Sequence, residues 1–115
     1  MSKLSCEGIG EMVVTMPAAD GVTGGQVVTL GEDGQVAACA SGQRPCGVAL
    51  EPRGGCAAVQ VGGFARVACS DSTVKPGFVT LCGDGKGGVK KAGQSDTGGE
   101  FLVAMADGTT ATIRL

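Results

Sequence analysis

The residues that could do chemistry in this chain are its carboxylates and cysteines, because the sequence contains no histidine. Histidine is the commonest general base, so serine or cysteine nucleophiles would have no imidazole to activate them. Asp33, Asp84 and Asp107 each precede a glycine, and such an aspartate typically accepts hydrogen bonds from the backbone of its own turn. We therefore expect no enzyme activity, and a small enzyme is the least favoured class of function.

The cysteines also do not form a recognisable metal site. They are Cys6, Cys39, Cys46, Cys56, Cys69 and Cys82, with no CxxC pair and no histidine to complete a zinc site. The sequence begins without an apolar signal segment, so we expect synthesis in the cytoplasm, where thiols stay reduced. We interpret the cysteines as small buried apolar residues that hold no metal or cofactor. A disulfide between Cys39 and Cys46 across a turn stays open.

Charge and glycine patterns argue against nucleotides, nucleic acids and membranes as partners. The segment from Gly83 to Gly88 looks like a phosphate loop but lacks the GxxxxGK[ST] spacing, and no helix is predicted after it. The net charge is −2, and Lys90-Lys91 is the only basic pair, whereas nucleic-acid binders carry a basic stripe. No window approaches 18 consecutive apolar residues, so we expect no transmembrane helix.

Short alternating apolar segments separated by glycine turns predict an all-β fold. Asp-Gly and Gly-Gly pairs between such segments are the strongest local signal for hairpins. The spacing of the turns is typical of a small β-barrel or sandwich. The strands are predicted at Gln26–Leu30, Gln35–Ala38, Cys46–Leu50, Ala57–Val61, Phe64–Cys69, Phe78–Leu81, Gly88–Lys91, Phe101–Met105 and Thr109–Leu115.

The predicted domain contains an internal repeat. Val28-Thr29-Leu30 matches Val79-Thr80-Leu81, and Gly47–Leu50 followed by Val59–Val61 matches Leu102–Met105 followed by Ile113–Leu115. The predicted strand at 64–69 lies between the two copies and is interpreted as a bridge. Such similarity at a nearly fixed offset indicates two copies of one strand-turn-strand unit.

Residues 1–24 differ from the single β domain predicted over 25–115. They contain one apolar run, Met12-Val13-Val14, followed by Pro17 and a stretch of small residues. One interpretation is an extended N-terminal arm, and the other is a plain edge strand from Glu11 to Met16; the sequence leaves both open.

The order of these motifs resembles the head decoration, or capsid cement, proteins of tailed bacteriophages. The resemblance covers roughly residues 24–115 and rests on "CGVALEPRGGCAAVQVGGFARV", on "FVTL" after a Pro-Gly, and on the closing "FLVAMADGTTATIRL". This chain departs from the family pattern in its cysteine content and in having Leu102-Val103 where a glycine is usual.

The resemblance implies a virion structural protein that is added to the outer surface of the capsid after the head has expanded. Such a protein binds the major capsid protein and clamps neighbouring subunits, and many members are homotrimers. The arm could add a strand to an exposed edge of the coat. We therefore expect the capsid contact at the residues Met12, Val13, Val14, Thr15 and Met16. The alternative is a non-catalytic β module on a virion tail or cell surface that binds a glycan or receptor. The sequence has three phenylalanines but no tryptophan or tyrosine, which disfavours a sugar platform.

Overall fold

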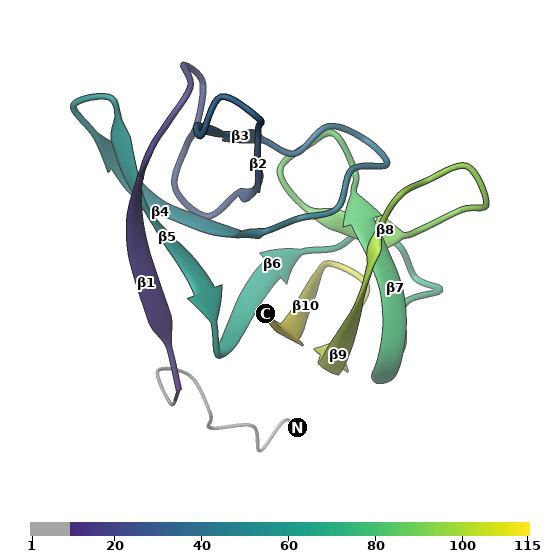
Figure 1. The fold of residues 1–115 in the computed structure, drawn as a ribbon. Helices are drawn as coiled ribbons and strands as arrows, with labels where there is room; N and C mark the ends of the chain where they lie inside the picture. Colours follow the sequence, from purple (N-terminus) through teal and green to yellow (C-terminus); the bar gives the residue numbers. More distant parts are fainter. Residues whose placement is uncertain (1–9) are drawn as a thin grey trace.

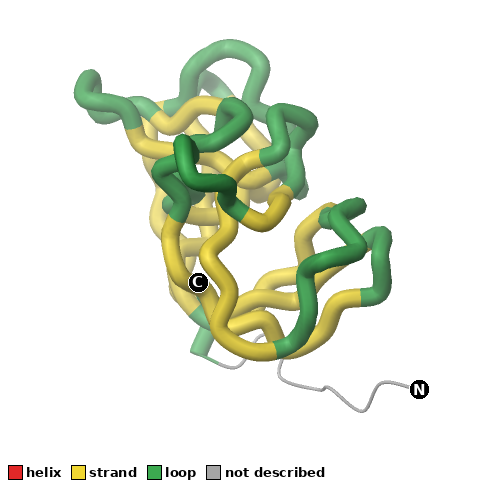
Figure 2. The backbone as a smooth tube through the Cα atoms, turned by 90° about the vertical axis from the view of Figure 1, so that its right-hand side faces the viewer, coloured by secondary structure: helices red, strands yellow, loops and turns green. Residues whose placement is uncertain are grey.

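The computed structural model describes residues 10–115, which form ten β-strands and no helix. Strands alternate with loops throughout (Figure 2). No helix in this part of the chain is long and apolar enough to cross a membrane. The strands are β1 (Met12–Pro17), β2 (Val27–Leu30), β3 (Val36–Ala38), β4 (Gly47–Arg53), β5 (Cys56–Gly62), β6 (Phe64–Ala68), β7 (Gly77–Gly83), β8 (Val89–Lys91), β9 (Gly99–Ala106) and β10 (Thr110–Arg114).

The strands form two five-stranded antiparallel sheets that pack together, so the all-β prediction is confirmed. The first sheet has the order β1-β5-β4-β2-β3, and the second has the order β6-β10-β9-β7-β8. Neither sheet closes into a barrel among the described residues, and the arrangement is nearer to a sandwich. In Figure 1 the two sheets diverge on either side of the short β5–β6 connection.

The internal repeat is a repeat of whole sheets, because the second strand order is the first with five added to each number. β6 is therefore the first strand of the second unit and corresponds to β1, so its interpretation as a bridge was wrong. The strand pairing also shows that the match of Gly47–Leu50 with Leu102–Met105, made from the sequence, is out by one residue. Val28 lies opposite Gly47, and Val79 lies opposite Phe101, so Gly47 corresponds to Phe101 rather than to Leu102.

The core consists of two clusters, and the first sheet contributes to both. Val28 and Ala49 belong to a cluster built from the first sheet and the segment that connects β1 to β2. Val27 and Val48, their neighbours in sequence, point to the opposite face and pack with residues of the second sheet. The first sheet is thus buried on both faces where β2 and β4 run side by side.

Candidate functional site

Strand β1, which carries the predicted contact residues, is an edge strand of the first sheet. It pairs antiparallel with β5 from Met12 to Pro17, and it stands at the end of the strand order. Of the two interpretations left open for this segment, the edge strand is the one that the structure shows. Val22, which follows β1, is buried in the core. Residues 1–9 of the predicted arm lie outside the described residues.

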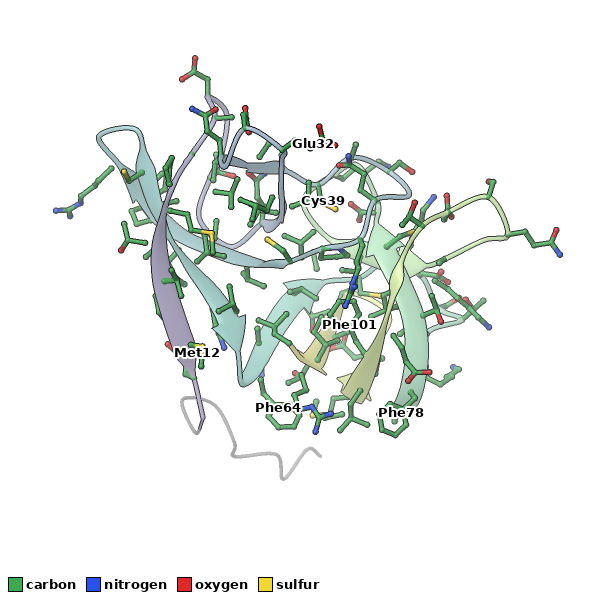
Figure 3. The ribbon with its side chains drawn as sticks, in the orientation of Figure 1. Met12, Glu32, Cys39, Phe64, Phe78 and Phe101 are labelled. Carbon is green, nitrogen blue, oxygen red and sulfur yellow. The ribbon has the colours of Figure 1, made fainter. Side chains whose placement is uncertain are left out.

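The structure brings the predicted contact residues to one strand but divides them between surface and core. Met12, Val13 and Val14 are 59%, 43% and 40% exposed, and Thr15 is exposed as well. Met16 is half-buried and packs against the cluster that contains Val28 and Ala49. Figure 3 shows Met12 on β1, away from the contact between the sheets. The surface of β1 is therefore built from Met12 to Thr15, with Met16 anchoring the strand.

The backbone of β1 offers hydrogen-bonding groups along its outer edge. The amide of Ala18 donates to the carbonyl of Gly55 at 2.8 Å, so the even-numbered residues of β1 turn their amides toward β5. Val13 and Thr15 therefore direct their N–H and C=O groups to the opposite side, where no strand of residues 10–115 pairs with β1. Pro17 is two residues beyond Thr15, so its backbone nitrogen also faces the open edge. A proline is tolerated there because it has no N–H and the sheet needs no donor at that place.

Two glycines hold the start of β1 against the β5–β6 connection. Gly63 has a φ of +81°, and a Cβ atom placed on it would lie 2.9 Å from the Cα atom of Glu11. A Cβ on Gly62 would lie 3.1 Å from that of Met12. The Gly62-Gly63 pair is a recognisable turn signal in the sequence, but its close approach to β1 could not be read from the turn alone.

A shallow groove of about 240 Å³ lies beside the start of β1. Its lining includes Glu11, Leu50 and Gln60. Gln60 is 6% exposed, and its side-chain amide donates to the carbonyls of Gly62 and Phe64 at 3.0 Å each. Sequence reasoning did not single out Gln60, although a glutamine between Val59 and Val61 in a strand of apolar residues was an available signal.

The aspartates of the Asp-Gly turns bind backbone amides, as predicted. Oδ1 of Asp33 accepts a hydrogen bond from Gln35, and Oδ1 of Asp84 accepts from Lys86 and Gly88. Asp107 accepts from the amides of Thr110 and Thr109, and these hydrogen bonds lower its pKa to about 2. These hydrogen bonds stabilise the turns, and they use the carboxylate oxygens of all three aspartates as acceptors for backbone N–H groups.

The five described cysteines are free thiols, so the possible Cys39–Cys46 disulfide is not formed. Cys39, Cys69 and Cys82 are buried, whereas Cys46 and Cys56 are half-buried. Burial raises the pKa of the Cys39 thiol to about 11. A thiol with such a pKa is a poor nucleophile at neutral pH.

The described residues also contain no cluster of acidic or cysteine side chains that could hold a metal ion. No protein-family profile matches the chain, and no curated protein sequence matches it either. The open edge of β1 is thus the feature on which a function can be argued.

Proposed function

We propose that this chain is a capsid decoration protein of a tailed bacteriophage. It binds the outside of the head and cements neighbouring major capsid subunits, with the outer edge of β1 as its contact. The proposal joins the resemblance in motif order to one observation, the exposed apolar edge strand at Met12–Pro17.

The geometry of β1 suits the addition of a strand from a partner. Val13 and Thr15 present backbone groups in one line that no strand of residues 10–115 pairs with, and strand addition derives its affinity from such groups. Met12 and Val14 supply apolar side chains next to that line. An exposed apolar edge invites pairing with another chain, which natural proteins usually prevent with charges or bulges. β1 has a register shift between Met12 and Val13 and a proline, Pro17, at its end, so the open stretch is Val13–Met16, and no charged residue lies within the strand.

A cement protein works by many modest contacts repeated over a shell, so one short edge strand on each copy is sufficient. In this proposal the protein resides on the outer capsid surface, and the major capsid protein is its partner. Its copies assemble as homo-oligomers, with a trimer favoured by the resemblance. The protein acts by contact alone, without a cofactor.

The test is to mix the purified chain with expanded heads that lack decoration protein and to sediment the heads. The proposal expects the chain to sediment with the heads and to saturate at a fixed number of copies per coat subunit. Unexpanded heads are the matched control, because the resemblance implies binding after expansion. If the chain stays in the supernatant with both kinds of head, the proposal is wrong, and a hit on a glycan array would then favour the alternative.

A further inference from the structure

A groove between the two sheets has the composition of a site for a small amphiphilic molecule. Its volume is about 440 Å³, and its lining comes from both halves of the chain. The lining is mostly apolar, and Arg44 is the only charged residue in it. Sites for small molecules are typically of this size and composition, with few polar groups, and they often lie between packed units.

The walls of the groove are apolar because it lies where the two core clusters meet. Cys46 and Val61 pack against the cluster built from the first sheet, whereas Phe101 belongs to the other cluster. Phe101 is 8% exposed and Leu30 is 52% exposed, so the lining runs from a buried aromatic ring to an open apolar rim. In Figure 3 Phe101 lies between the two sheets, whereas Phe78, which is 67% exposed, lies at the margin of the molecule.

The cation of the groove lies on the backbone of β9. A Cβ atom placed on Gly99 would lie 2.5 Å from Nε of Arg44 and 3.0 Å from its Cδ, so only glycine leaves room for this side chain where it lies. Phe101 is two residues beyond Gly99 in a regular stretch of β9 and therefore faces the same side. The aliphatic stem of Arg44 thus packs on the sheet, and the residue stays exposed to solvent.

The guanidinium of Arg44 forms no ion pair with a carboxylate of residues 10–115. Glu100 precedes Phe101 in β9, so its side chain points to the opposite face of the strand. Asp96 instead accepts a hydrogen bond from the amide of Gly93 at 2.8 Å. The groove therefore combines apolar walls with a cation that is available to a ligand. Guanidinium groups bind carboxylates with two parallel hydrogen bonds.

We infer that this groove binds a small monocarboxylate with an apolar chain, of the medium-chain fatty-acid class. The carboxylate pairs with Arg44, and the chain lies along Leu30 toward Phe101. The ligand thus contacts both halves of the molecule. The inference goes beyond the proposed function, because no contact with the coat takes part in it.

The experiment is a calorimetric titration of the purified chain with decanoate up to about 1 mM, well below the concentration at which it forms micelles. The wild-type chain is expected to bind decanoate saturably. Decyltrimethylammonium has the same chain and the opposite charge, and acetate has the charge without the chain. Each should bind at least about tenfold more weakly than decanoate, because each makes only one of the two contacts.

Two variants of the groove separate the charge from the apolar wall. Arg44→Gln removes the cation and Leu30→Ser removes apolar surface, and each should raise the dissociation constant for decanoate about tenfold. Arg53→Gln is the matched control for Arg44→Gln, because Arg53 is exposed, lies in a different groove and loses the same charge. All three residues are exposed, so the variants should fold, which circular dichroism checks.

Cys46 reports whether decanoate occupies this groove, because it is part of the lining. Saturating decanoate should slow the alkylation of Cys46 by iodoacetamide several-fold. The alkylation of Cys56 should not change, because Cys56 lies in the groove that contains Arg53.

A chain that does not bind decanoate saturably by about 1 mM overturns the inference. So does binding that Arg44→Gln weakens no more than Arg53→Gln does, binding that decyltrimethylammonium matches, or binding that leaves the alkylation of Cys46 unchanged. If expanded heads protect Cys46 and decanoate does not, the groove takes a segment of the coat and the inference is also wrong. Binding of decanoate by a chain that does not sediment with heads would instead refute only the proposed function.

Discussion

Replacing Thr15 with proline tests whether the backbone edge of β1 binds the coat. The amide of Thr15 points away from β5, so proline removes a donor that no strand of residues 10–115 uses. Proline is tolerated in an edge strand at such a position, and Pro17 already occupies an equivalent one. We therefore expect the free energy of unfolding to change by no more than about 1 kcal/mol, within the usual range for surface substitutions with a backbone effect.

The effect on binding should be much larger than the effect on folding. Strand addition at this position would lose one backbone hydrogen bond and leave the coat acceptor without a partner. Together these losses cost about 2 kcal/mol. This corresponds to an increase of about thirtyfold in the dissociation constant for each contact. Binding of labelled chain to expanded heads, titrated by sedimentation, measures the change.

Thr15→Val is the matched control, because it replaces the side chain and keeps the backbone N–H. It should bind heads within about threefold of the wild-type chain, a change below 1 kcal/mol. The reasoning is refuted if Thr15→Pro is folded, as judged by circular dichroism and the urea midpoint, and binds heads as tightly as Thr15→Val. In that case any contact with the coat would not use the outer edge of β1.

Three further predictions concern the domain itself. Gly63→Ala should lower the free energy of unfolding by about 1–3 kcal/mol, because alanine is strained at a positive φ and its Cβ would press on the start of β1. Gly108→Ala is the control, because Gly108 also has a positive φ but has open space around it. A urea titration should show a smaller loss for Gly108→Ala than for Gly63→Ala. The lowered pKa of Asp107 stabilises the folded state above the unfolded pKa near 4, and this contribution is lost as the pH falls toward 2. Asp107→Asn should therefore flatten the acid limb of a plot of urea midpoint against pH, and an unchanged limb would contradict the assigned hydrogen bonds. In the native protein at pH 8, iodoacetamide should modify Cys56 before Cys39, because Cys39 is buried with a raised pKa; peptide mapping that finds Cys39 first would show that its site opens readily.

The strands and turns could be predicted from the sequence because their signals are local. Asp-Gly or Gly-Gly pairs mark seven of the nine connections between the described strands, all except β3–β4 and β6–β7, and the alternation at Thr110–Arg114 is visible without tertiary information. The nine strands predicted after residue 25 all occur, with ends that differ by up to three residues. The repeat was visible for the same reason, since the turns recur in both halves.

Pairing between distant strands could not be predicted, because it depends on which faces can be buried together. Val13 lies opposite Gln60, a partner that no local pattern specifies. Once β1 is placed beside β5, β6 has an obvious counterpart, and its role changes from a bridge to the first strand of the second unit. The exposed position of Phe78 was also hidden, because an apolar residue that alternates in a strand normally indicates a core-facing side chain.

The central claim is that the protein strengthens a capsid, and heat disruption of heads tests it most directly. Expanded heads that lack decoration protein would be heated with and without a saturating amount of the chain, and DNA release would be followed by dye fluorescence. The account predicts that the chain raises the temperature of release, and that Thr15→Pro at the same concentration raises it less. Release at the same temperature with and without the wild-type chain would contradict the account.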